Sequence, residues 1–196
     1  MGSKHDHGPS LSKYGVKMME IDTKDKILAA LKDSNQRAAN RFQEIQVTEF
    51  FTRHGEVWSP SDNLDHLIKA VKPITKVLKL SRIILHAMFG KPEKASVSYE
   101  ELCQLYRNVI AKGGQAAGRY LPEQKSPVSN AEAEKRSLLE GWTNASGELV
   151  SVAEKWQEAD LDQYRLPHPL LGKLTIREML YFTIYHNLRH ASQEGD

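Results

Sequence analysis

Two histidines four residues apart, His186 and His190, are the residues of this sequence whose type and spacing best fit a chemical task. On a helix, side chains at this spacing lie about 40° apart around the axis and about 6 Å apart along it. Both imidazoles can therefore converge on one ion at the roughly 2.0–2.1 Å of a zinc–nitrogen bond. A third histidine, His66, lies in another helical pattern. Together the three residues predict a site for a divalent metal ion.

The apolar pattern around each histidine indicates which way it faces. His186 and His190 fall on the inward half of their expected helix, and His66 lies at the edge of an apolar arc, in line with Ala70 and Val77. A buried imidazole must be hydrogen-bonded or ligated, and three ligands leave coordination positions open. Core histidines satisfied by hydrogen bonds are the structural alternative. The opposite face of the last helix is expected to be polar and carries Glu178, Tyr185, Arg189 and Ser192.

The elements that must position these residues are helical nearly throughout. Ser59 and Pro60 are typical of a helix start, and Thr175 with Glu178 forms a capping-box pattern. Pro73 predicts a kink or a break within its helix. No apolar–polar alternation is long enough to build a sheet, so the chain is predicted to be all-α, a four-helix bundle with one additional short helix between the second and third long ones. The expected helices span residues 22–55, 59–90, 98–112, 130–156 and 175–191, with loops over 118–129 and 164–172.

Length and composition are those of a globular protein. The 196 residues predict one domain over residues 21–196, after a flexible leader over residues 1–20. A formal net charge of +2 argues against nucleic-acid binding through bulk electrostatics. No apolar run approaches the roughly 18 residues of a membrane span. The single cysteine, Cys103, favours a reducing compartment, so a cytoplasmic location is expected.

Two stretches of the chain resemble the DinB-like four-helix-bundle superfamily, which includes damage-inducible proteins and metal-dependent thiol transferases. In the first, Trp58 enters the second helix ahead of His66. The second, residues 168–193, follows the pattern H-P-x-x-G-x-L-T and then H-x-x-x-H-x-x-Q. The resemblance covers most of residues 20–195 and implies a zinc or nickel ion on the three histidines, and a homodimer. The short helix over residues 98–112 departs from the minimal four-helix plan.

Three further residues are candidates for the surroundings of the metal. Gln193 follows His190 by nearly one turn and could orient a ligand, or it could be a polar residue at a helix end. His168 could border the pocket mouth, although packing within the Pro167–Pro169 turn is the favoured interpretation. Asp62 could hold an imidazole N–H, and charge complementarity at a helix start explains it equally well. Solvated surface is expected for Arg119, Arg165 and Arg177, and a structural role for Cys103.

These observations leave two functional hypotheses. In the first, the protein is a metal-dependent thiol S-transferase or hydrolase, in which the ion activates a small thiol or water against an electrophile. In the second, it is a non-enzymatic, stress-associated binding bundle whose metal site is structural or incidental. Neither hypothesis includes a nucleic acid or a membrane as a partner.

Overall fold

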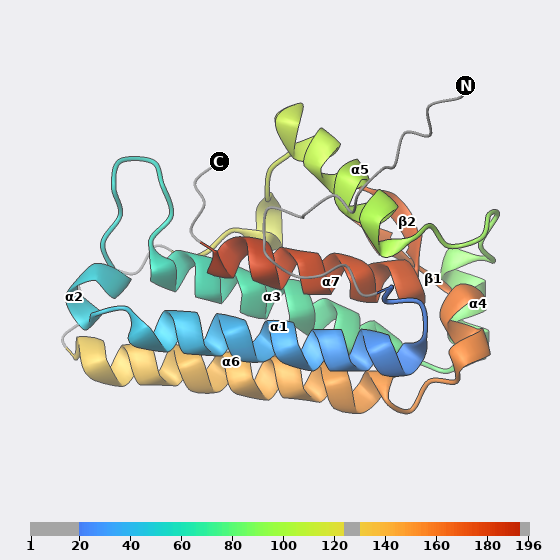
Figure 1. Ribbon diagram of the computed structural model, residues 1–196, viewed down its shortest axis with the longest axis horizontal. Coiled ribbons are helices and arrows are strands. Elements are labelled where there is room, and N and C mark those ends of the chain that lie inside the picture. Colours follow the sequence, from blue (N-terminus) through green and yellow to red (C-terminus); the bar gives the residue numbers. More distant parts are fainter. Residues whose placement is uncertain (1–19, 124–129, 193–196) are drawn as a thin grey trace, which may run out of the picture.

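Four long helices lie side by side in the structure, a computed structural model that describes residues 20–123 and 130–192 (Figure 1). They are α1 (Lys24–Glu44), α3 (Pro60–Leu78), α6 (Ala131–Ala153) and α7 (Ile176–Ala191). Helix α1 packs on α6 and α7, and α3 packs on the same two helices. The predicted all-α four-helix bundle is confirmed. Of the expected leader, all but residue 20 lies outside the described residues.

The predicted helix starts are confirmed by their capping bonds. Ser59 and Asp62 form a capping box at the start of α3, and Thr175 and Glu178 form one at the start of α7. Each box satisfies backbone N–H groups that have no partner within the helix. Behind these starts the core is closely packed, and the largest of its fully buried side chains are Trp142 of α6 and Trp156. In the described part of the chain, no helix is both long enough and apolar enough to cross a membrane.

The first two expected helices are each divided in the structure. The first ends at Glu44 and is followed by the short helix α2 (Val47–Phe50). The second breaks after α3 and resumes as α4 (Arg82–Phe89), because the Ser81 side chain accepts from the N–H of Ile84 and starts a new helix. Pro73 does not end α3, which continues for five more residues while burying Ile74 and Leu78. Tertiary packing here overrides the local preference.

A small hairpin replaces the loop that was expected before the last helix. Strand β1 (Arg165–His168) pairs antiparallel with β2 (Gly172–Thr175), and Leu166 lies opposite Leu174. Gly172 has a φ of 77°, a left-handed conformation that glycine adopts without strain. Strands of four residues are too short to show a clear alternation of apolar and polar side chains, which explains why the sequence pattern did not reveal them.

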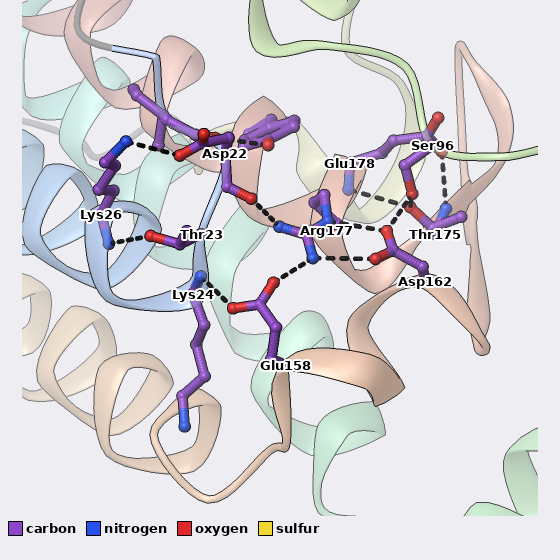
Figure 2. A network of polar contacts seen from close by, with 12 residues as sticks. Asp22, Thr23, Lys24, Lys26, Ser96, Glu158, Asp162, Thr175, Arg177 and Glu178 are labelled. Atoms are coloured by element: carbon purple, nitrogen blue, oxygen red, sulfur yellow. Dashed lines mark hydrogen bonds and ion pairs between the residues drawn. The ribbon is translucent and has the colours of Figure 1, made fainter.

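Arg177 contradicts the expectation of a solvated surface residue, because it is buried at the start of α7 (Figure 2). Its guanidinium donates to both carboxylate oxygens of Asp162, at 2.8 and 2.9 Å, and to the carbonyl of Asp22 at 2.7 Å. It also pairs with Glu158. Asp162 and Glu158 bound the 3₁₀ helix η2 (Glu158–Asp162). Arg177 therefore joins η2, the entrance to α1 and the start of α7.

Helix α7 has no wide polar face, contrary to expectation. Glu178 and Tyr185 are both 8% exposed, and all residues from Ile176 to Asn187 are buried. The cause is the predicted additional helix, α5 (Tyr99–Ala111), which packs against the side of α7 that faces away from the bundle (Figure 1). The Glu178 carboxylate accepts from the N–H of Val97, just ahead of α5. A helix covered on all sides does not follow a simple amphipathic pattern.

Candidate metal centre

The three predicted histidines come together in the structure. His66 projects from α3, and His186 and His190 project from α7, one turn apart. One ring nitrogen from each lies within 4.8 Å of the others, and Nε2 of His66 is 3.1 Å from Nε2 of His186. Two nitrogens that share an ion at normal zinc bond lengths and angles lie about 3.0–3.4 Å apart. The spacing of these two imidazoles therefore suits a shared divalent ion.

Hydrogen bonds on the other ring nitrogens fix which atoms can bind metal. Nδ1 of His66 lies 2.7 Å from the carbonyl oxygen of Tyr120, and Nδ1 of His190 lies 2.7 Å from Oδ1 of Asn63. The Asn63 amide cannot be reversed without loss, because its Nδ2 donates to the carbonyls of Trp58 and Ser59. Both Nδ1 atoms face acceptors and must donate, so in the neutral rings each Nε2 keeps a free lone pair.

Burial keeps the cluster uncharged. It lowers the pKa of His66 despite the opposing effect of the Tyr120 carbonyl. It also lowers the pKa values of His186 and His190 to well below the usual range, and the neighbouring imidazoles and Arg189 add to the effect. Neutral imidazoles are the form that binds metal, so at neutral pH no proton has to be removed from these rings before a metal ion can bind.

Aromatic rings hold the imidazoles in place on two sides. The Trp58 ring lies 5.1 Å from His66, and 6.4 Å from His190 with the two planes only 18° apart. Phe182, one turn before His186 on α7, stacks on that ring at 4.9 Å. These contacts restrict ring rotation and limit access of water to the cluster.

The carbonyl that orients His66 belongs to a segment tied to α3. Lys69 donates to the carbonyl of Leu121 at 3.0 Å, and Asp65 accepts from the N–H of Glu123 at 3.0 Å. Lys69 and Asp65 are themselves paired at 2.9 Å. His66 and two nearby residues of α3 thus hold the segment from η1 (Gly118–Tyr120) to Glu123 over one side of the cluster.

The other predicted site residues have different positions. Asp62 bonds to Ser59 and Arg53 and does not contact an imidazole, in agreement with a capping role. Nδ1 of His168 accepts from the N–H groups of Leu170 and Leu171, as the turn interpretation requires, while its ring also lines the cavity beside the cluster. Gln193 lies outside the described residues.

Two functional groups were missed by the sequence analysis. Asn63 lies one turn before His66 on the same face of α3, but its partner is His190 of α7, which only the packing of the two helices reveals. Tyr120 acts through its backbone carbonyl, for which side-chain type gives no signal.

Cys103 is buried, and burial raises the pKa of its thiol to about 11, so the expected structural role suits it. Arg119 is exposed, and Arg165 pairs with Glu93 and donates to the Phe89 carbonyl.

The histidine cluster opens into a cavity of about 830 Å³. Helices α3, α5 and α7, the β1–β2 hairpin and the segments before α3 and around η1 all contribute side chains to it. A volume of this size accommodates a small organic molecule next to the ring nitrogens.

Replacing Asn63 with leucine is expected to lower metal affinity about 10–100-fold, because the acceptor that fixes Nδ1 of His190 is lost. Asn63→Asp keeps an acceptor at this position and is expected to retain most of the affinity. Competition titration of zinc against a chromophoric chelator measures both. Equal losses of zinc affinity in the two variants would show that the hydrogen bond to His190 does not contribute to metal binding.

The free energy of unfolding of the metal-free protein is expected to decrease as the pH is lowered from 6.5, and part of this decrease comes from His168. Burial lowers the pKa of this imidazole to about 4, so between pH 6.5 and about pH 4 the unfolded chain binds the proton and the folded chain does not. Stability is therefore lost as pH falls through this window, by about 2–3 kcal/mol at most. In His168→Asn, which can still accept from the turn, urea unfolding at pH 7 and pH 4 should show a correspondingly smaller loss. If wild type and His168→Asn lost the same stability between pH 7 and pH 4, the assignment of this effect to His168 would be contradicted.

A structure similar to this chain is the crystal structure of the colibactin self-resistance protein ClbS in complex with double-stranded DNA. The match has a TM-score of 0.44 and 14% sequence identity, and it covers 88% of this chain and 93% of that one. The complex overturns the exclusion of nucleic acid as a partner, which was wrong, since near-neutral net charge says nothing of local charge. The expected homodimer and the thiol or electrophile partner gain no support from this match. No curated protein sequence matches significantly.

The profile of the DinB superfamily matches residues 30–193, a range that contains the whole of α3, α5, α6 and α7 and all three histidines. The match extends from within α1 to just beyond α7, so it covers the bundle and the cluster together. The chain therefore belongs to the DinB superfamily.

Proposed function

We propose that the protein is a metal-dependent enzyme in which His66, His186 and His190 hold a zinc or nickel ion that activates water or a small thiol for hydrolysis or transfer. One observation carries this proposal: three neutral imidazoles converge on the wall of a cavity large enough for a substrate, and hydrogen bonds direct the Nε2 lone pairs of His66 and His190 into the cluster. A fold alone does not imply a reaction, so the proposal rests on the chemistry of this site.

The residues of the site would divide the work as follows. A divalent ion on the three imidazoles would lower the pKa of the water or thiol that it binds. Asn63 and the Tyr120 carbonyl hold the protons on Nδ1 and so direct the Nε2 lone pairs. The rings of Trp58 and Phe182 shield the imidazoles from bulk water, which strengthens electrostatic interactions at the site.

The non-enzymatic alternative expects a closed site with a fourth protein ligand. Within residues 20–123 and 130–192, the group that could hold a metal ion has three members and a cavity beside it. Three ligands and an open side are typical of catalytic zinc sites, whereas structural sites have four. This favours the enzyme. We place it in the cytoplasm, since its single cysteine is a buried free thiol.

The test uses full-length protein purified without metal-affinity resin. Elemental analysis is expected to find a divalent metal close to one per chain. Panels of activated esters for hydrolysis, and of small thiols with a chromogenic electrophile for transfer, should then reveal an activity that a chelator removes and zinc or nickel restores. For the metal content, His54→Ala, which alters an exposed histidine outside the cluster, is the matched control. An activity indifferent to chelation and reconstitution would contradict the proposal.

A further inference from the structure

We infer that the substrate of this site is an amphiphile, with a polar metal-binding head and a linear apolar chain that lies along α3 and α7. The inference rests on the proposed function, because it takes the histidine cluster as the position of the reacting head. The shape and the polarity of the cavity carry it.

The cavity is long because two helices line it over several turns. On α3 the lining residues follow one face from His66 through Ala70 and Ile74 to Val77. At 1.5 Å per residue this face is about 16 Å long. On α7 the lining runs backwards from His190 to Met179, over the same number of residues. The amino end of α3 and the carboxyl end of α7 lie at the same end of the bundle, so the two faces run alongside each other (Figure 1).

The arm of the cavity that leads away from the histidines is mainly apolar and partly enclosed, since Ala70 and Val77 along it are only half-buried. Ile74 of α3 and Met179 of α7 form its walls, and Tyr106 of α5 and Leu166 of the hairpin cover it. All four side chains are buried, between 2% and 8% exposed. The lining offers few polar partners, so water gains little there, and an apolar chain is the occupant that such an arm favours.

The other end of the cavity is polar and open. It is lined by Glu49, Thr52, His54 and Glu56, all of which are exposed. The histidine cluster lies between this mouth and the apolar arm. A molecule that enters tail first would fill the arm with its chain and leave its head at the imidazoles. An extended alkyl chain rises about 1.25 Å per carbon, so once the head takes a few ångströms of the roughly 16 Å, the arm matches a chain of about ten carbon atoms.

Straight-chain hydroxamates test the inference, because their common head chelates divalent metals and only the tail changes. In calorimetric titrations of the zinc-loaded protein, affinity should rise about threefold to fourfold with each methylene from acetohydroxamate to decanohydroxamate. Beyond that length it should level off, where the chain exceeds the arm. An affinity that is independent of chain length would overturn the inference.

A variant at the far end of the arm shows whether the chain lies there. Val77→Trp should move the levelling-off to shorter chains and leave acetohydroxamate binding unchanged, since Val77 lies about 16 Å from the histidine level along α3. Lys76→Trp adds the same bulk to the exposed neighbouring position and should keep the wild-type profile. An unchanged profile in Val77→Trp would contradict the placement of the chain, even if wild-type affinity rises with length.

The same titrations separate this inference from the proposed function. A protein that holds zinc and binds acetohydroxamate, but gains nothing from a longer tail, contradicts the amphiphile alone. A protein that holds no divalent metal contradicts the proposed function and, with it, the assignment of the head.

Discussion

Zinc affinity is expected to fall by about a hundredfold or more when His190 is replaced by alanine. Apparent binding energies of about 10–16 kcal/mol for four-ligand zinc sites imply about 3 kcal/mol for each ligand. His190 supplies one of three imidazoles, and Asn63 already directs its free nitrogen toward the cluster. His66→Ala should have an effect of similar size, although its ligand comes from a different helix.

Competition titration at pH 7 measures this loss, and circular dichroism shows whether each variant is folded. Without metal, the free energy of unfolding of each variant should lie within about 1–2 kcal/mol of the wild-type value. The lost ring packing is offset by removal of a desolvated imidazole. His54→Ala, at a position 70% exposed, should bind zinc as wild type does. Folded His66→Ala and His190→Ala proteins with full metal content would refute the three-histidine site.

Replacing Arg177 with methionine is expected to lower the free energy of unfolding by about 2–3 kcal/mol. Loss of one partner from a buried ion pair typically costs about 3–5 kcal/mol, since the other charge stays behind without compensation. The expected value is smaller here because the Asp162 and Glu158 side chains are 40% and 51% exposed and regain some solvation. The carbonyl of Asp22 also loses its donor (Figure 2).

Urea unfolding at pH 7 measures the effect of Arg177→Met. Arg177→Lys keeps the charge but loses the bidentate hydrogen bond with Asp162, so an intermediate loss in the free energy of unfolding is expected. Lys32→Met breaks an ion pair with Glu154 whose members are both about half exposed, and it should cost less than 1 kcal/mol. If Arg177→Met were as stable as Lys32→Met, the contacts of Arg177 with η2 and with the entrance to α1 would not stabilise the fold more than an exposed ion pair does.

The three histidines of the cluster could be predicted from sequence because helical geometry is regular. A spacing of four residues puts His186 and His190 on one face of α7, and the apolar pattern of α3 turns His66 toward them. The capping signals at Ser59 and Thr175 set where these two helices start. Local rules therefore sufficed to bring the three histidines together and to identify the four long helices, although not where the first two of them end.

What sequence could not reveal depends on contacts between distant segments. The partner of His66 is a backbone carbonyl 54 residues away, at Tyr120. The burial of Arg177 and Glu178 follows from η2 and the segment before α5, which lie beside α7 only in the folded chain. The hairpin strands are too short to carry a periodic pattern. In each case the interaction that decides the structure is a tertiary contact, and no local sequence pattern indicates it.

Both proposals require that three imidazoles share one divalent ion and leave positions open for a substrate. X-ray absorption at the zinc edge, on full-length protein loaded with one equivalent of zinc, tests it most directly. We expect three imidazole nitrogens at about 2.0–2.1 Å, together with at least one water oxygen that decanohydroxamate replaces with its own two oxygens. A spectrum with oxygen ligands and no imidazole scattering, or with four protein ligands and no response to the hydroxamate, would contradict it.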